Sequence, residues 1–172
     1  MMVATLILLG AAAGAGVVPA RGPIPYWLPT GAATTLLALA AITGANTAPA
    51  TGFAMAAAYV LTVAASVTGG SPVVTVVFRL ARRSDTPAPD AVTQPLHGGR
   101  TIGVLERSAV AASILAGWPE GIAIVLAVKG LARYPELRGA QASAASEQFI
   151  IGTFTSVMWA VAACGVGRAL VT

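Results

Sequence analysis

Ionisable side chains are scarce in this chain, and several of them lie within strongly apolar stretches. Of the 172 residues, 56% are hydrophobic and only 9% are charged. In the back half of the chain, Glu106 and Lys129 lie on either side of an apolar run. That run is broken at Gly117, Pro119 and Glu120. Carboxylates and amines in such surroundings can pair with each other, bind an ion or relay a proton.

The break predicts a helix, a turn and a second helix across residues 100–134, with Gly117, Pro119 and Glu120 at the tip. Glycine often ends a helix, and proline suits the first position of the next one. Arms of about 14–17 residues span about 21–25 Å, which is short for crossing a bilayer core of about 30 Å. The hairpin is therefore either re-entrant or a tilted pair of short spans. Both geometries return the chain to the side that it left.

Glu106 and Lys129 are equally far in sequence from the point between Gly117 and Trp118. On adjacent antiparallel arms they therefore fall at the same depth. A paired charge is tolerable inside a bilayer, whereas an unpaired one is costly, so the spacing predicts an ion pair. The alternative is that both side chains snorkel to the cytoplasmic interface.

The remaining ionisable residues of this region have more than one possible role. Arg107 and Arg133 are expected nearer the mouth of the hairpin. Glu120 is either a helix-start carboxylate or an ionisable group that could bind a cation or relay a proton. Glu147 suits the start of the last helix and could also pair with Arg133 or Arg107. His97 is the only histidine, and no other metal-ligating residues cluster around it, so neither a metal site nor a cofactor is expected.

These residues need apolar helices to position them, and the composition predicts an all-α, polytopic membrane protein. A soluble domain averages about 25% charged residues, and the mean hydropathy here is +0.81. The Gly69-Gly70-Ser71-Pro72 stretch either kinks the third span or ends it and starts a short interfacial helix. About four full spans are expected beside the hairpin, at 2–19, 30–46, 51–69 and 146–167.

The chain divides into a three-span region at 1–83, a loop at 84–98, and the hairpin with the last span at 99–172. Lys and Arg residues cluster beside the loop and around Arg138, which favours a cytoplasmic location for both. The amino terminus then lies outside and Arg21 inside. The start of the chain lacks the basic residues of a signal peptide, so it is interpreted as a span. The wealth of Ala, Gly, Val and Arg is typical of a bacterial protein, which places it in the inner membrane.

Small residues recur at helical spacing in the first and last spans. Gly10 and Gly14 form one such ridge, and a row at i, i+4 spacing runs from Gly152 through Ser156 to Cys164. Small residues at this spacing mark faces where helices approach closely. So much small-residue surface predicts a homo-oligomer. The net charge of +4 comes from basic residues beside apolar spans, so no nucleic-acid partner is expected.

Three blocks in the back half carry a family resemblance. GRTIGVLER, AVKGLARYPEL and SEQFIIGTFTS resemble the carboxy-terminal part of an uncharacterised bacterial integral-membrane family, with the patterns G-x-x-I-G-x-L-E-R, A-x-K-x-L-x-R-x-x-E and E-x-x-I-G-T-x-x-S. The resemblance begins at Gly98, and it implies a membrane location and no activity. Glu120 is outside the pattern, which favours its structural role. The charged positions that match are Glu106, Arg107, Lys129, Arg133, Glu136 and Glu147.

Two functions follow from this pattern. The first is a channel or transporter for a small ion or solute, because broken helices with paired charges are how membrane proteins build central polar sites. The second is a structural or assembly subunit, in which the same charges only lock helices together. An enzyme is less expected, because no nucleophile motif or phosphate-binding loop is present. The candidate pathway or lock residues are Glu106, Arg107, Lys129, Arg133 and Glu147.

Overall fold

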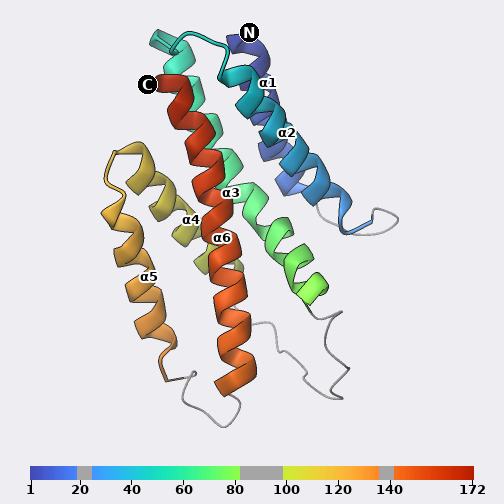
Figure 1. Ribbon diagram of the computed structural model, residues 1–172, viewed down its shortest axis with the longest axis vertical. Helices are drawn as coiled ribbons and strands as arrows, with labels where there is room; N and C mark the ends of the chain where they lie inside the picture. Colours follow the sequence, from blue (N-terminus) through green and yellow to red (C-terminus); the bar gives the residue numbers. More distant parts are fainter. Residues whose placement is uncertain (19–24, 82–98, 136–141) are drawn as a thin grey trace.

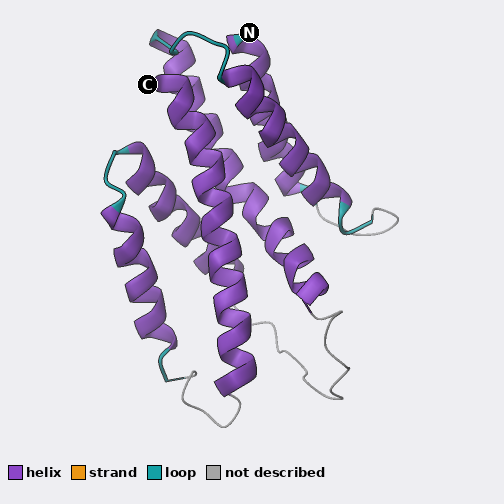
Figure 2. Cartoon of the chain, viewed as in Figure 1, coloured by secondary structure: helices purple, strands orange, loops and turns teal. Residues whose placement is uncertain are grey.

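The computed structural model describes residues 1–18, 25–81, 99–135 and 142–172, and it is all-helical over these ranges (Figures 1 and 2). The predicted all-α class is therefore confirmed for the described part of the chain. The helices are α1 (Met2–Val17), α2 (Leu28–Gly44), α3 (Gly52–Ala81), α4 (Gly99–Leu115), α5 (Glu120–Arg133) and α6 (Ala142–Val171).

The two longest helices, α3 and α6, pack against each other at the centre of the molecule. Each has 30 residues, or about 45 Å. Helices α1 and α2 pack together on one side of this pair, and the α4–α5 hairpin lies on the other (Figure 1). Helix α4 contacts both α3 and α6, and α5 packs against α4.

Both chain termini lie at the same end of the bundle (Figure 1). There the backbone N–H of Ala50 donates to the carbonyl of Leu170 at 2.7 Å, and the Thr5 hydroxyl donates to the Thr43 hydroxyl at 2.9 Å. The helix ends that lead into residues 19–24, 82–98 and 136–141 lie toward the opposite end. The predicted common side of the membrane for these connections stays a prediction, and Arg21, His97, Glu136 and Arg138 lie outside the described residues.

Within the described residues, two helices are long and apolar enough to cross a membrane, fewer than the four full spans predicted. They are α3 and the part of α6 from Ser146 onward, and only 28% and 33% of their apolar windows are buried inside the molecule. Helices α1 and α2 are apolar but have only 16 and 17 residues. Helix α1 ends at Val17, two residues before the predicted end of the first span, whereas α2 has the predicted length but begins and ends two residues earlier.

Helix α3 continues through Pro72 to Ala81. The prediction of a third span at 51–69 was therefore too short, and the alternative of a separate interfacial helix is wrong. Proline has no N–H, so the carbonyl of Thr68 loses its partner within the helix. Such breaks are tolerated where neighbouring polar groups satisfy the backbone. Here Arg107 of α4 donates from Nε to the adjacent carbonyl of Val67 at 2.9 Å.

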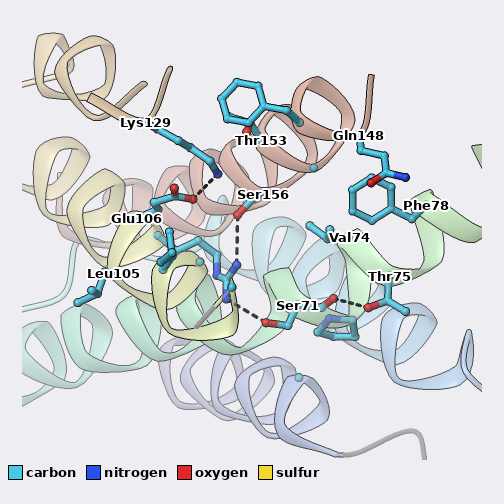
Figure 3. Close-up of a pocket in the computed structure, with 18 of the residues that line it drawn as sticks. Ser71, Val74, Thr75, Phe78, Leu105, Glu106, Lys129, Gln148, Thr153 and Ser156 are labelled. Atoms are coloured by element: carbon cyan, nitrogen blue, oxygen red, sulfur yellow. Dashed lines mark hydrogen bonds and ion pairs between the residues drawn. The ribbon is translucent and has the colours of Figure 1, made fainter. Parts of the chain in front are cut away.

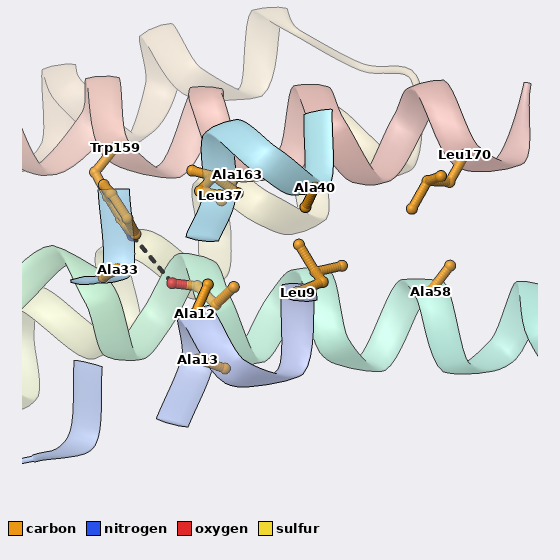
Figure 4. Packing of buried hydrophobic residues seen from close by; sticks show 11 residues of the cluster. Leu9, Ala12, Ala13, Ala33, Leu37, Ala40, Ala58, Trp159, Ala163 and Leu170 are labelled. Atoms are coloured by element: carbon orange, nitrogen blue, oxygen red, sulfur yellow. Dashed lines mark hydrogen bonds between the residues drawn. The ribbon is translucent and has the colours of Figure 1, made fainter. Parts of the chain in front are cut away.

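The end of the bundle that holds the termini is filled with small and aliphatic side chains. Fully buried alanines of α1, α2, α3 and α6 surround Leu9, Leu37 and Leu170 (Figure 4). Trp159 closes this core toward the middle of the bundle, and its Nε1 donates to the carbonyl of Ala65 at 3.0 Å. Burial of such closely fitted apolar groups leaves few gaps, so the interior of this half of the molecule is closely packed.

Glycines permit the closest helix contacts. A Cβ at Gly16 would lie 2.6 Å from backbone atoms of Thr68 and Gly69, so α1 and α3 nearly touch there. A Cβ at Gly69 would collide with the Trp159 ring. Glycine is therefore required at both positions by close approach rather than by backbone conformation.

The predicted small-residue row of α6 is used inside the chain. A Cβ at Gly152 would lie 2.9 Å from the Phe78 ring of α3, and Ser156 and the Cys164 thiol are buried. Gly10 approaches Leu61, but Gly14 is exposed, and a Cβ added there would meet no atom within 4 Å. Within the described chain, therefore, Gly14 packs against no other helix. The row from Gly152 to Cys164, which suggested a homo-oligomer, is accounted for within one chain.

The contact between α1 and α3 gives a matched pair of glycine substitutions. Gly16→Ala should lower the free energy of unfolding by about 1–3 kcal/mol, because backbone cannot move aside without separating two helices. Gly14→Ala, in the same helix, should be neutral or stabilise by up to about 1 kcal/mol. Unfolding of both variants in one detergent measures the difference, and equal effects would contradict the close crossing at Gly16.

Candidate functional site

A cavity of about 1140 Å³ lies at the end of the bundle away from the termini. It is partly open to the outside, and all six helices contribute to its wall. Helices α3 to α6 supply most of the lining, whereas α1 and α2 contribute only near the ends that face each other across residues 19–24. Apolar side chains of the wall include Val17, Val74, Phe78, Ile102, Val128 and Phe149.

The α4–α5 hairpin positions one side of the cavity, and local sequence determines its turn. Gly117 has a φ of 72°, in the left-handed region that ends many helices. The N–H of Trp118 bonds the carbonyl of Ser113 at 2.8 Å, and that of Gly117 bonds Ile114 at 3.1 Å, which is the Schellman pattern. Pro119 is the N-cap residue of α5, one position earlier than predicted. The predicted helix, turn and helix are therefore confirmed.

The predicted ion pair across this hairpin is present. Lys129 Nζ donates to Glu106 Oε2 at 2.5 Å, and the two side chains retain 19% and 15% of their exposure. The Lys129 ammonium also lies 5.8 Å from the centre of the Phe149 ring, within reach of a cation–π attraction. Lys129 therefore connects α5 with both α4 and α6 along the cavity wall (Figure 3).

Arg107 is the most deeply buried ionisable side chain of the cavity wall, with 3% exposure. Its Nη1 donates to Ser156 Oγ at 3.2 Å and its Nη2 to Ser71 Oγ at 3.0 Å (Figure 3). A Cβ at Gly70 would lie 2.5 Å from the arginine side chain, so glycine is needed for its passage. The prediction that Arg107 lies near the mouth was wrong, because this face of α4 turns toward α3 and α6.

Several polar lining residues were not singled out from the sequence. Ser71 and Thr75 lie on α3 around Pro72, and Gln148 and Thr153 lie on α6. The Thr153 hydroxyl oxygen is buried and has no hydrogen-bond partner within the described structure. A usable signal was present, since Thr153 lies three residues before Ser156, and residues at this spacing share a helix face.

Positive charge predominates along the cavity wall. The described lining contains the basic residues Arg79, Arg107, Lys129 and Arg133 and one carboxylate, Glu106. Arg79 lies with its guanidinium carbon 4.2 Å from the centre of the Tyr26 ring. Within the described residues, no group of three or more metal-ligating side chains occurs. The arrangement is suited to binding an anionic group through charge and hydrogen bonds.

The structure gathers most of the predicted pathway residues and excludes the rest. Glu106, Arg107, Lys129 and Arg133 all line the cavity, whereas Glu147 is exposed and outside the lining. Glu120 is exposed as the first residue of α5 and is also outside the lining. This position agrees with its predicted helix-start role. The exposed hairpin tip lies beside Arg168, whose Nη1 donates to the carbonyl of Ile114 at 3.0 Å.

The ion pair can be tested with a double-mutant cycle. Glu106→Gln and Lys129→Met should each destabilise the protein, because each leaves a mostly buried charge without its partner. The double variant should recover part of the loss, with a coupling energy of about 1–3 kcal/mol. Unfolding of the four proteins in one detergent provides the measurement, and strictly additive effects would show that the pair contributes nothing.

The buried guanidinium can be tested with a substitution that retains its charge. Arg107→Lys should lower the free energy of unfolding by about 2–4 kcal/mol, because an ammonium cannot reach the carbonyl of Val67 and both hydroxyls in the same geometry. Arg168→Lys serves as the control, since Arg168 is exposed and donates to a single carbonyl. It should cost less than about 1 kcal/mol. Equal losses of unfolding free energy in the two variants would show that the hydrogen bonds of Arg107 stabilise the protein no more than that of Arg168.

Comparison with known proteins identifies no relative. No family model, curated protein or solved structure matches the chain significantly. The resemblance of the three charged blocks to an uncharacterised membrane family therefore remains an expectation. Charge, size and hydrogen-bonding groups of the cavity are the properties that bear on its function.

Proposed function

We propose that the protein is an integral membrane carrier that takes up a small solute in the cavity between α3, α4, α5 and α6. One observation carries this proposal: a cavity of about 1140 Å³ has an ion pair and a buried arginine in its wall. Polar and charged groups at the interface of transmembrane helices are expensive, and they typically mark solute or ion pathways.

The outer surface of the bundle supports a membrane location. Large apolar side chains are exposed on most of the helices, among them Ile42, Val60, Leu131 and Phe154, each more than half exposed. Soluble monomers rarely expose apolar surface on this scale. In this proposal α3 and α6 cross the bilayer and α1 and α2 are shorter spans. The hairpin is a tilted pair whose tip lies beside Arg168, close to the end of α6.

The basic residues set the proposed orientation. Most of them lie, in sequence, within or next to the segments 19–24, 82–98 and 136–141, including Arg21, Arg79, Arg83, Arg133 and Arg138. The helix ends that lead into these segments lie toward the cavity end (Figure 1). Cytoplasmic connections carry such an excess of Lys and Arg. The cavity therefore opens toward the cytoplasm of a bacterial cell, and the amino terminus lies outside the inner membrane.

The closed end of the cavity favours a carrier over a channel. Beyond Trp159 and Ala65, the space between the helices is filled by the apolar core around Leu9 and Ala163. An open channel needs a polar path through both halves, whereas a carrier exposes its site to one side at a time. Helix α3 carries Pro72 at the boundary between the two halves, where a helix can bend.

The alternative is a structural or assembly subunit, and the contacts of Arg107 favour it. This side chain joins α4 to Val67 and Ser71 of α3 and to Ser156 of α6. A hydrogen-bonded arginine of this kind can hold helices together without any solute. A lock alone, however, does not account for the large cavity beside it.

Solute flux distinguishes the two functions. The purified protein is reconstituted in liposomes with one of five probes inside: potassium, chloride, inorganic phosphate, glycerol or hexyl phosphate. The carrier proposal expects at least one probe to cross faster than in protein-free vesicles. Equally slow release of every probe would overturn the carrier and leave the structural subunit.

Matched tryptophan substitutions connect flux to the cavity. Val74→Trp and Val128→Trp fill the cavity from α3 and α5 and should reduce flux about tenfold or more. Val60→Trp lies on the exposed face of α3, where Val60 is 67% exposed, and should leave flux unchanged. Circular dichroism and gel filtration confirm folding, and flux retained in both cavity variants would exclude this cavity as the pathway.

A further inference from the structure

The cavity wall combines excess positive charge, an unpartnered buried hydroxyl and a broad apolar surface. From this combination we infer that the solute is an amphiphilic anion, namely a hydrocarbon body carrying one phosphate or carboxylate group. The inference rests on the proposed function, because it names the solute class of the same cavity.

The charge of the wall selects an anion. Arg79, Arg107, Lys129 and Arg133 line the cavity with Glu106 as the one carboxylate of the described lining, and Glu106 already accepts from Lys129. A net positive wall at the boundary of a low-dielectric interior attracts an anion and repels a cation. Guanidinium groups also match the paired oxygens of phosphate and carboxylate.

A buried hydroxyl points to a ligand oxygen. Thr153 is 5% exposed, and its Oγ1 has no hydrogen-bond partner in the described structure. The hydroxyls of Thr30, Thr62 and Ser66 are also buried without a partner, but of the four only that of Thr153 lines the cavity. An unsatisfied buried polar group costs about 1–3 kcal/mol, which an oxygen of a bound anion would offset. One helical turn further along α6, the Ser156 hydroxyl already accepts from Arg107. The anionic group is thus expected near Thr153, on the wall that Arg107 and Lys129 share.

The size and apolar part of the wall call for a hydrocarbon body. Pockets for small ligands commonly measure about 300–1,000 Å³, so a bare phosphate or carboxylate ion would occupy only a fraction of this cavity. The remainder is lined by aliphatic and aromatic side chains, among them Val74, Phe78 and Phe149. Ile102 and Val128 also line it and are more than half exposed. Apolar contact along this wall gains free energy in proportion to the area removed from water.

Probes with one chain and different heads test the inference. The protein is placed in nanodiscs of zwitterionic phosphatidylcholine, and equilibrium binding of radiolabelled dodecyl phosphate is measured with empty nanodiscs subtracted. Saturable binding is expected. Unlabelled dodecanoate should compete if the site accepts either anionic head, whereas dodecyltrimethylammonium should not compete. Inorganic phosphate should compete only at concentrations about 100-fold higher, because it lacks the apolar body.

Charge-removing variants locate the site. The double substitution Arg79→Gln with Arg133→Gln should weaken dodecyl phosphate binding about tenfold or more, because it removes two of the positive charges of the wall that attract the anion. Thr153→Val should weaken it about three- to tenfold. Arg168→Gln removes one guanidinium charge at the hairpin tip, away from the cavity, and should change binding less than about twofold. Gel filtration and circular dichroism establish that each variant is folded.

Each contrary outcome overturns a stated part of the inference. An anionic ligand at this site would be excluded by any of three results. These are the absence of saturable binding, equal competition by dodecyltrimethylammonium, and unchanged binding after substitution of Arg79 and Arg133. If inorganic phosphate competed as strongly as an unlabelled amphiphilic anion, the ligand would still be an anion, but a hydrocarbon body would be excluded. Saturable binding without flux of any probe would overturn the carrier and keep the ligand class. Flux of potassium or glycerol without binding of dodecyl phosphate would keep the carrier and overturn the amphiphilic anion as its solute.

Discussion

The burial of one guanidinium, that of Arg107, determines how three helices meet. A charge taken out of water is tolerated only when its donors find acceptors. Arg107 finds them in the Val67 carbonyl and in the hydroxyls of Ser71 and Ser156. Its side chain reaches these groups only because Gly70 has no side chain. Together these requirements fix the position of α4 against both central helices, and with it the position of the hairpin that encloses the cavity.

The same short segment of α3 separates a closely packed half of the molecule from the half that holds the cavity. Before it, Gly69 admits the ring of Trp159 and the helices pack around small residues (Figure 4). From Ser71 onward the facing side chains are polar or line the cavity (Figure 3). Pro72 removes a helical hydrogen bond at this boundary, and the neighbouring Val67 carbonyl accepts from Arg107. A charged donor from another helix therefore lies directly beside the break, although it bonds the Val67 carbonyl and not the Thr68 carbonyl that lacks the proline N–H.

The parts of the structure that were predictable from sequence depend on local rules. The hairpin followed from Gly117 and Pro119, and the ion pair followed from the equal spacing of Glu106 and Lys129 about the turn. The depth of Arg107 was not predictable, because it depends on which face α4 turns toward α3. The sequence left open whether the third span continues through Pro72 or ends there, because local propensity at a proline can be overridden by tertiary contacts. The sequence could not show whether the small residues of α6 pack against another helix of the same chain or against a second copy, because both contacts require small residues.

The partial exposure of the ion pair bears on the choice between a lock and a pathway. A pair that only held helices together could be replaced by well-packed apolar side chains at little or no cost in stability. Glu106 and Lys129 instead keep 15% and 19% exposure beside an open cavity. The neighbouring Thr153 leaves its hydroxyl without a partner, as Thr62 and Ser66 also do within the closed core, but of these three only Thr153 lines the cavity. These polar groups are partly exposed to solvent or lack a hydrogen-bond partner within the chain. They are therefore available to a molecule that enters the cavity. This wall is therefore better explained by a binding role than by helix packing alone.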